Sequence, residues 1–196
     1  MRIRCLLTVL AAIMIFTAAC TQEKAPPPSD SSSTDVIRDS APYLCTFVPE
    51  YALRLASGVT GPLTERAGGT KADGECRTPD ADPNPLSVAW SQELGGRTEK
   101  DLDYILDDKQ KVFGRHGGIA LPVGLGEGMA VHLPYGLFTG QPYEVVAKFS
   151  CGGKKRLLSL SFAQFVKGRD AIKDMTELMR IAQKRYGVLY HCTPGR

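Results

Sequence analysis

Residues 143–162 read YEVVAKFSCGGKKRLLSLSF, two runs of alternating residues on either side of Gly152-Gly153. A two-residue Gly-Gly loop is typical of a tight β-hairpin and fixes which residues of the two strands face each other. In that register Cys151 faces Lys154. The other facing pairs are Phe149–Arg156, Ala147–Leu158, Val145–Leu160 and Tyr143–Phe162.

This register sorts the hairpin side chains into two faces. One face collects the apolar residues Tyr143, Val145, Ala147, Phe149, Leu158, Leu160 and Phe162. The other face carries Glu144, Lys148, Ser159 and Ser161, which we expect to point to solvent. A slip of one residue would mix the two sets, so the pattern and the turn predict the same hairpin.

Three segments around the hairpin have helical signals. Residues 49–58 (PEYALRLASG) begin with Pro49 and end at Gly58, the usual positions of these residues at helix ends. Residues 98–114 offer Thr98 as the N-cap and place Leu102, Ile105, Leu106 and Phe113 on one face. Residues 169–187 have apolar residues at helical spacing, and we expect Gly187 to end that helix.

Further strands are expected at residues 86–92, 119–123 and 129–133. Helices beside a largely antiparallel sheet make an α+β domain. Residues 41–196, about 155 in number, are enough for one such domain with its own core.

The N-terminus has the three parts of an export signal. Arg2 and Arg4 are followed by an apolar stretch over residues 5–16 and by the small residues of TAAC, 17–20. The TAAC segment resembles the lipobox of bacterial lipoproteins, which implies cleavage after residue 19 and lipid attachment to Cys20. Ordinary signal cleavage after Ala19 is the alternative, since Thr-Ala-Ala also fits a small-x-small site.

Cysteine counting favours the lipoprotein. The chain has six cysteines, and Cys5 is lost with residues 1–19. If Cys20 carries lipid, four remain, which can close two disulfides in an oxidising compartment. Four cysteines allow three pairings, and local closure favours Cys45–Cys76 and Cys151–Cys192. Because C-x-x-C is absent and no fourth ligand would complete a zinc site, we expect neither a metal nor a cofactor.

Residues 20–40 begin with Cys20 and continue as a Ser/Pro-rich stretch with few apolar residues. We therefore expect this segment to be a disordered linker with a mean reach of roughly 25 Å. Signal removal also lowers the charge. The whole chain has 24 basic and 21 acidic residues, and loss of Arg2 and Arg4 leaves a net charge of +1. This balance gives no support to nucleic-acid binding.

The lipobox, the Ser/Pro linker, the segment PYLCTFVPEYALRLA (42–56) and the strand LSVAW (86–90) resemble a family of small actinobacterial lipoproteins. The segment LPVGLGEGMAV (121–131) and the hairpin after it are similar to that family's second half. The resemblance implies a lipid-anchored protein on the outer face of the cytoplasmic membrane, with a domain of unknown function. An alpha-beta sandwich like that of PsbP-like proteins is a second layout that fits.

One loop is a candidate contact site. Residues 132–143 (HLPYGLFTGQPY) place Tyr135, Leu137 and Phe138 among Gly and Pro. Exposed, these side chains would form an apolar patch of the kind that marks a contact site. The alternative is that the loop folds inward and its aromatic residues complete the core.

Two functional classes follow. The first is a non-catalytic binding or accessory module of the cell envelope, a monomer whose partner is a protein, glycan or lipid. The second is an extracytoplasmic hydrolase with a site built from scattered residues. The three histidines lie far apart in the sequence and no G-x-S-x-G motif occurs, so no catalytic residue is assigned.

Overall fold

The computed structural model describes residues 35–80, 84–94, 97–134 and 141–195. Its helices are α1 (Glu50–Ser57), α2 (Glu99–Arg115) and α3 (Ala171–Tyr190). Its strands are β1 (Tyr43–Leu44), β2 (Val48–Pro49), β3 (Arg66–Gly69), β4 (Asp73–Arg77), β5 (Leu86–Gln92), β6 (Ile119–Ala120), β7 (Glu127–His132), β8 (Tyr143–Cys151), β9 (Lys154–Phe162) and β10 (Pro194–Gly195). The expected α+β class is confirmed.

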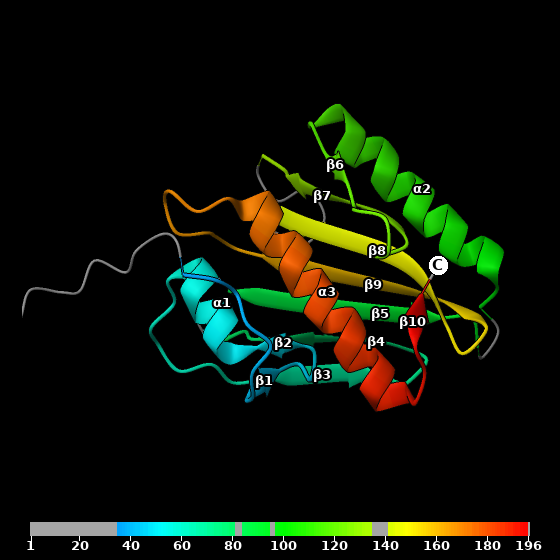
Figure 1. The fold of residues 1–196 in the computed structure, drawn as a ribbon, viewed down its shortest axis with the longest axis horizontal. Helices are drawn as coiled ribbons and strands as arrows, with labels where there is room; N and C mark the ends of the chain where they lie inside the picture. Colours follow the sequence, from blue (N-terminus) through cyan, green and yellow to red (C-terminus); the bar gives the residue numbers. More distant parts are fainter. Residues whose placement is uncertain (1–34, 81–83, 95–96, 135–140, 196) are drawn as a thin grey trace, which may run out of the picture. The chain divides into compact units, whose positions relative to one another are not determined.

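Eight of the strands form one antiparallel sheet, in the order β3-β4-β5-β9-β8-β7-β6, with β10 paired to β8 (Figure 1). Strands β1 and β2 form a separate pair. Strand β5 has the predicted bounds, whereas the strand predicted at 119–123 ends at Ala120 and the one predicted at 129–133 spans Glu127–His132. Strands β1, β2, β3, β4 and β10 were not predicted.

The β8–β9 hairpin lies at the centre of the sheet in the predicted register. Tyr143 faces Phe162 and Cys151 faces Lys154, with the pairs between them as expected. Gly152 and Gly153 have φ angles of 63° and 73°, the left-handed conformation that a two-residue hairpin turn requires at both positions. The Gly-Gly turn therefore accounts for the register.

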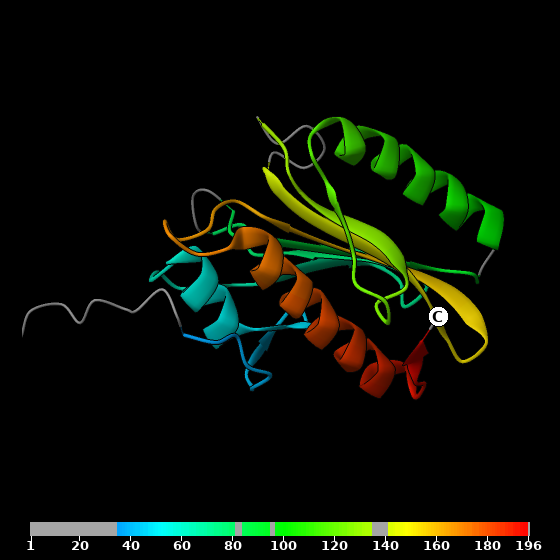
Figure 2. The ribbon, with the colours of Figure 1, turned by 45° about the horizontal axis from the view of Figure 1, so that its top comes forward.

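Both faces of the sheet are covered by helices (Figure 2). On one face α1 and α3 pack over a core that includes Val145, Ala147, Leu158 and Leu160. On the other face α2 packs over a smaller core of Leu102, Leu106, Phe113, Val131, Leu133, Val146 and Leu157. The sheet is thus the middle layer of three.

The covering of the second face by α2 makes one prediction from the sequence wrong. Glu144, Lys148 and Ser161 were expected to point to solvent, but all three are buried, and Ser159 is half-buried. The Glu144 carboxylate accepts a hydrogen bond from Lys109 of α2 at 2.8 Å, and the Lys148 ammonium pairs with Asp103 of the same helix. Because these charges are paired across the interface, polar residues can occupy a covered face.

Helix α1 ends and helix α2 begins as predicted, whereas Pro49 is the N-cap of α1 rather than a residue of its first turn, and α2 continues one residue past Gly114 to Arg115. Gly58 ends α1 in the left-handed conformation, with φ of 74°. At the start of α2 the backbone N–H of Thr98 donates to the Asp101 carboxylate at 2.7 Å, while the Thr98 hydroxyl accepts from the Asp101 backbone N–H at 3.4 Å. This reciprocal capping box satisfies two groups that a helix start otherwise leaves unpaired.

Helix α3 continues one turn beyond the predicted stop at Gly187 and ends at Tyr190, with His191 as its left-handed cap. Gly187 serves close packing instead. A Cβ at this position would lie 2.6 Å from the Cys192 carbonyl oxygen and 2.7 Å from the Pro194 ring. The missing side chain lets the last residues of the chain fold back over the helix.

The two disulfides pair as local closure predicted: Cys45 with Cys76, and Cys151 with Cys192. The first joins the segment after β1 to β4. The second joins the end of β8, at the hairpin tip, to the residues after α3. Among the residues that the structure describes, no helix is both long and apolar enough to cross a bilayer.

Candidate functional site

The sequence-predicted site residues divide into two groups. Cys20 and the contact-loop residues Tyr135, Leu137 and Phe138 lie outside the described residues. The four cysteines 45, 76, 151 and 192 are described, and each is in a disulfide.

The described residues contain one group with metal-ligand atoms close together. Cys45, Glu65 and Cys76 place these atoms within 4.8 Å of one another. The two sulfurs are bonded to each other, so they are not available as thiolate ligands. This group is a disulfide with a neighbouring carboxylate and does not form a metal centre.

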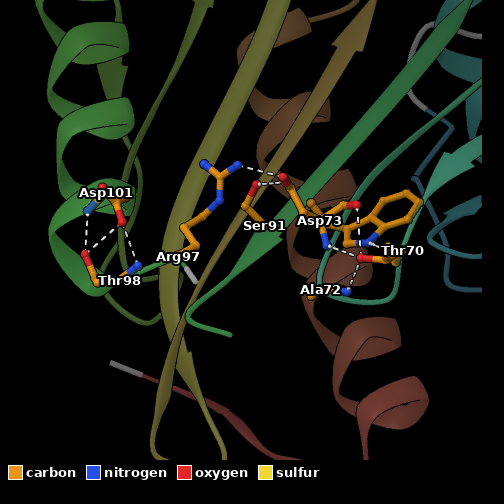
Figure 3. Close-up of polar contacts among 8 residues, drawn as sticks. Thr70, Ala72, Asp73, Ser91, Arg97, Thr98 and Asp101 are labelled. Atoms are coloured by element: carbon orange, nitrogen blue, oxygen red, sulfur yellow. Dashed lines mark hydrogen bonds and ion pairs between the residues drawn. The ribbon is translucent and has the colours of Figure 1, made fainter. Parts of the chain in front are cut away.

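A groove opens between the sheet and the first turns of α2. It has a volume of about 680 Å³ and is lined by residues from three segments: Thr70, Ala72 and Asp73; Leu94 and Arg97; and Asp101, Tyr104 and Ile105. We call it the α2 groove. Figure 3 shows Arg97, just before α2, reaching across to Asp73 at the start of β4.

Asp73 is the centre of the polar contacts in the α2 groove. One oxygen of its carboxylate accepts from the Arg97 guanidinium at 2.6 Å, and the other accepts from the Ser91 hydroxyl at 2.5 Å. The contacts hold three side chains from different segments in fixed positions (Figure 3). Binding a ligand there would therefore require little further ordering of these side chains.

The turn between β3 and β4 is held from both sides. The Thr70 hydroxyl accepts from the backbone N–H groups of Ala72 and Asp73, both at 3.1 Å. The Trp90 indole N–H donates to the Thr70 carbonyl at 2.9 Å. Gly74 lets the indole lie against the strand, because a Cβ there would lie 2.5 Å from the ring.

Asp101 adds a negative charge on the side of the α2 groove that α2 itself forms. Its carboxylate accepts hydrogen bonds from the backbone N–H and the hydroxyl of Thr98. These bonds, the backbone one most, lower the pKa of Asp101 below the ordinary value of 3.8. Asp101 is therefore ionised at neutral pH. Among the described residues, the charged side chains that line the α2 groove are thus two carboxylates and one guanidinium.

The rim of the α2 groove is apolar. Tyr104 is 75% exposed and Leu94 is 53% exposed, while Ile105 is half-buried beside them. Tyr104 and Asp101 are three residues apart on α2, so they lie on the same side of the helix. The groove thus combines an exposed ring with the hydrogen-bonded side chains of Asp73, Arg97 and Ser91, which we call the polar floor.

Two further cavities of the described part lie along α3. One, of about 740 Å³, is lined by Arg180, Lys184, His191 and Thr193 among others, with no carboxylate side chain among its described lining residues. The other, of about 910 Å³, has Asp35, Arg169, Asp174 and Thr176 in its lining, and no described histidine. The described residues of the α2 groove also include no histidine. In the described part of the chain, no histidine therefore lines any of these three cavities together with a carboxylate side chain.

The described histidines occupy element ends. His116 follows α2, His191 follows α3, and both are exposed. His132 ends β7, where its ring stacks on Tyr143 with ring centres 4.3 Å apart. The three histidines therefore lie at the ends of three different elements.

Sequence reasoning missed the α2 groove. Its polar floor depends on the unpredicted β3–β4 hairpin, which brings Asp73 beside Ser91. One available signal was Tyr104, a large aromatic residue among the positions of α2 that lie off its apolar face.

Comparisons of the chain with protein-family models, with curated proteins and with solved structures found no match.

Proposed function

We propose that the chain is a lipoprotein anchored through Cys20 to the outer face of the bacterial cytoplasmic membrane. Its domain would work as a non-catalytic binding or accessory module of the cell envelope. The observation that carries this proposal is the complete pairing of the four described cysteines. With Cys5 removed in the signal, Cys20 is the cysteine left over for lipid.

Disulfides support the extracytoplasmic side, since structural disulfides persist in oxidising compartments and are rare in the cytosol. The resemblance to small actinobacterial lipoproteins belongs to this proposal as well. The PsbP-like layout is also part of this proposal, and the presence of helices on both faces of an antiparallel sheet supports it. The net charge near +1 for the mature chain favours a neutral or mixed-charge partner over a strongly charged one.

The anchor is tested by replacing Cys20 with Ala and separating membranes from soluble material. We expect wild-type protein in the membrane fraction with an incorporated palmitate analogue, and the variant unlabelled and released or unprocessed. Cys5→Ala is the matched control, because residue 5 leaves with the signal. Equal labelling and fractionation of wild type and Cys20→Ala would overturn the anchor.

Binding is favoured over catalysis by the state of the polar groups in the α2 groove. The Ser91 hydroxyl donates to a carboxylate that is already paired with a guanidinium, and no described histidine lines the groove to act as a general base. A hydrolase would need a nucleophile and a base within hydrogen-bond reach of each other and of the substrate. The groove instead offers fixed hydrogen-bonding groups beside an exposed ring.

The binding role is tested by crosslinking in intact cells and recovery of the mature protein with its partners. The contact loop is tested in the same experiment by replacing Tyr135, Leu137 and Phe138 with Ser. If those side chains are exposed, stability should change by no more than about 1 kcal/mol while partner recovery falls. A large loss of stability would show that the loop belongs to the core.

A further inference from the structure

The exposed ring of Tyr104 sets the first requirement on a ligand of the α2 groove. The side chain is 75% exposed and stands on the rim above the polar floor. An aromatic ring offers a flat apolar face, and its hydroxyl remains able to hydrogen-bond in water. A matching ligand needs one flat apolar face and polar groups at its edge.

The polar floor sets the second requirement. A carboxylate has about four lone-pair positions, and Asp73 uses two of them with Ser91 and Arg97. Arg97 has five N–H groups, and the ion pair engages those of Nη2. The floor can therefore accept and donate further hydrogen bonds side by side, which suits a group that does both, such as a hydroxyl.

Charge sets the third requirement. An anionic ligand at Arg97 would also face the carboxylates of Asp73 and Asp101, and a cationic ligand at those carboxylates would face the guanidinium. The Asp73–Arg97 pair at 2.6 Å already neutralises its own two charges. The remaining carboxylate, Asp101, lies in the first turn of α2, where the positive end of the helix dipole and the hydrogen bonds from Thr98 compensate its charge. An uncharged ligand therefore meets no like charge in the groove.

We infer that the α2 groove is a binding site for a neutral carbohydrate. One sugar ring stacks its C–H face on Tyr104, and its hydroxyls bond to Asp73, Arg97 and Asp101. The volume of about 680 Å³ lies within the range of about 300–1,000 Å³ that is usual for small-ligand sites. This inference rests on the proposed binding function and names the ligand class of that module.

The test uses mature full-length protein purified from membranes in detergent, titrated with four neutral hexasaccharides: maltohexaose, cellohexaose, an α-mannohexaose and a β-galactohexaose. Trp90 is the single tryptophan of the chain, and its indole bonds to the groove residue Thr70, so its fluorescence reports on the groove. We expect saturable binding of at least one hexasaccharide. Hexagalacturonate and a chitosan hexamer, the acidic and basic counterparts, should bind at least tenfold more weakly.

Variants assign the binding to the groove. Tyr104→Ala should raise the Kd at least tenfold, about 1.4 kcal/mol, whereas Tyr104→Phe should keep it within about threefold because the ring remains. Tyr51→Ala removes an exposed tyrosine of α1, on the opposite face of the sheet, and should leave the Kd unchanged. The inference is overturned if none of the four neutral sugars binds, if a charged hexamer binds better, or if Tyr104→Ala binds like wild type.

The two proposals can fail separately. If Cys20→Ala leaves the membrane and groove variants lose an envelope partner, but no neutral sugar binds, the lipoprotein module stands and the carbohydrate inference falls. If sugar binding depends on Tyr104 but Cys20→Ala fractionates like wild type, the carbohydrate site stands and the anchor falls.

Discussion

The ammonium of Lys109 on α2 lies 2.8 Å from the carboxylate of Glu144, a residue of the central strand β8 that is only 1% exposed. The other carboxylate oxygen of Glu144 is buried with no hydrogen-bond partner among the described residues. The single ion pair therefore compensates a charge that water does not reach. Removing its cation would leave that charge isolated.

We expect Lys109→Met to destabilise the protein by about 3–5 kcal/mol, because removing one partner of a buried ion pair leaves an uncompensated buried charge. Adding Glu144→Gln should restore most of the loss, since no charge then remains. Urea unfolding followed by near-UV circular dichroism measures both. Lys111→Met, at an exposed position of the same helix, should stay within about 0.5 kcal/mol of wild type. Equal losses for Lys109→Met and the double variant would contradict this account.

Glycines 187 and 114 are predicted to respond in opposite directions to alanine. A Cβ on Gly187 would lie 2.6 Å from the Cys192 carbonyl oxygen, whereas a Cβ on Gly114 of α2 meets nothing within 4 Å. Gly187→Ala should therefore cost about 1–3 kcal/mol through overpacking. Gly114→Ala should stabilise by up to about 1 kcal/mol through helix propensity. Thermal unfolding of the two variants gives the sign, and a stabilising Gly187→Ala would refute the close-packing role.

The two disulfides should contribute almost equally to stability. They close loops of 31 and 41 residues, for which the chain-entropy model gives about 3–4 kcal/mol each and a difference of only a few tenths. Removing either pair by a double Cys→Ser change, followed by denaturant unfolding, tests this. Thiol labelling of denatured, unreduced mature protein should give almost no signal. A much larger loss for one pair would show that native packing around it, rather than loop closure, decides its contribution.

The β8–β9 hairpin and the disulfide pairing were predictable because each depends on short-range information. Gly152-Gly153 and the alternation of Leu158 and Leu160 with Ser159 and Ser161 set the register without any distant contact. The pairing followed from local closure once Cys5 and Cys20 were set aside.

Strands β3 and β4 could not be predicted in this way. Their sequences, RAGG and DGECR, have no run of alternating apolar residues, and β4 takes its place from pairing with β5. The α2 groove depends on this hairpin and on α2 together. The polar face of β8 was misjudged for a related reason, since Glu144 and Lys148 are paired by residues of α2 and of β7 that lie far away in the sequence.

The capping box of α2 should make stability depend on pH in the acid range. Hydrogen bonds from Thr98 hold the pKa of Asp101 below 3.8, so the ionised form is favoured in the folded protein. A lowered folded-state pKa contributes stability above the unfolded value and loses it as the pH falls through the folded value. Wild type should thus have a higher free energy of unfolding than Asp101→Asn at pH 7, and this difference should shrink below about pH 3.8.

Thr98→Ala should lower the free energy of unfolding by about 1 kcal/mol at pH 7. Asp107→Asn removes an exposed carboxylate elsewhere on the same helix and controls for the loss of one negative charge from α2. A constant gap between wild type and Asp101→Asn from pH 7 to pH 3 would show that the ionised carboxylate does not cap the helix.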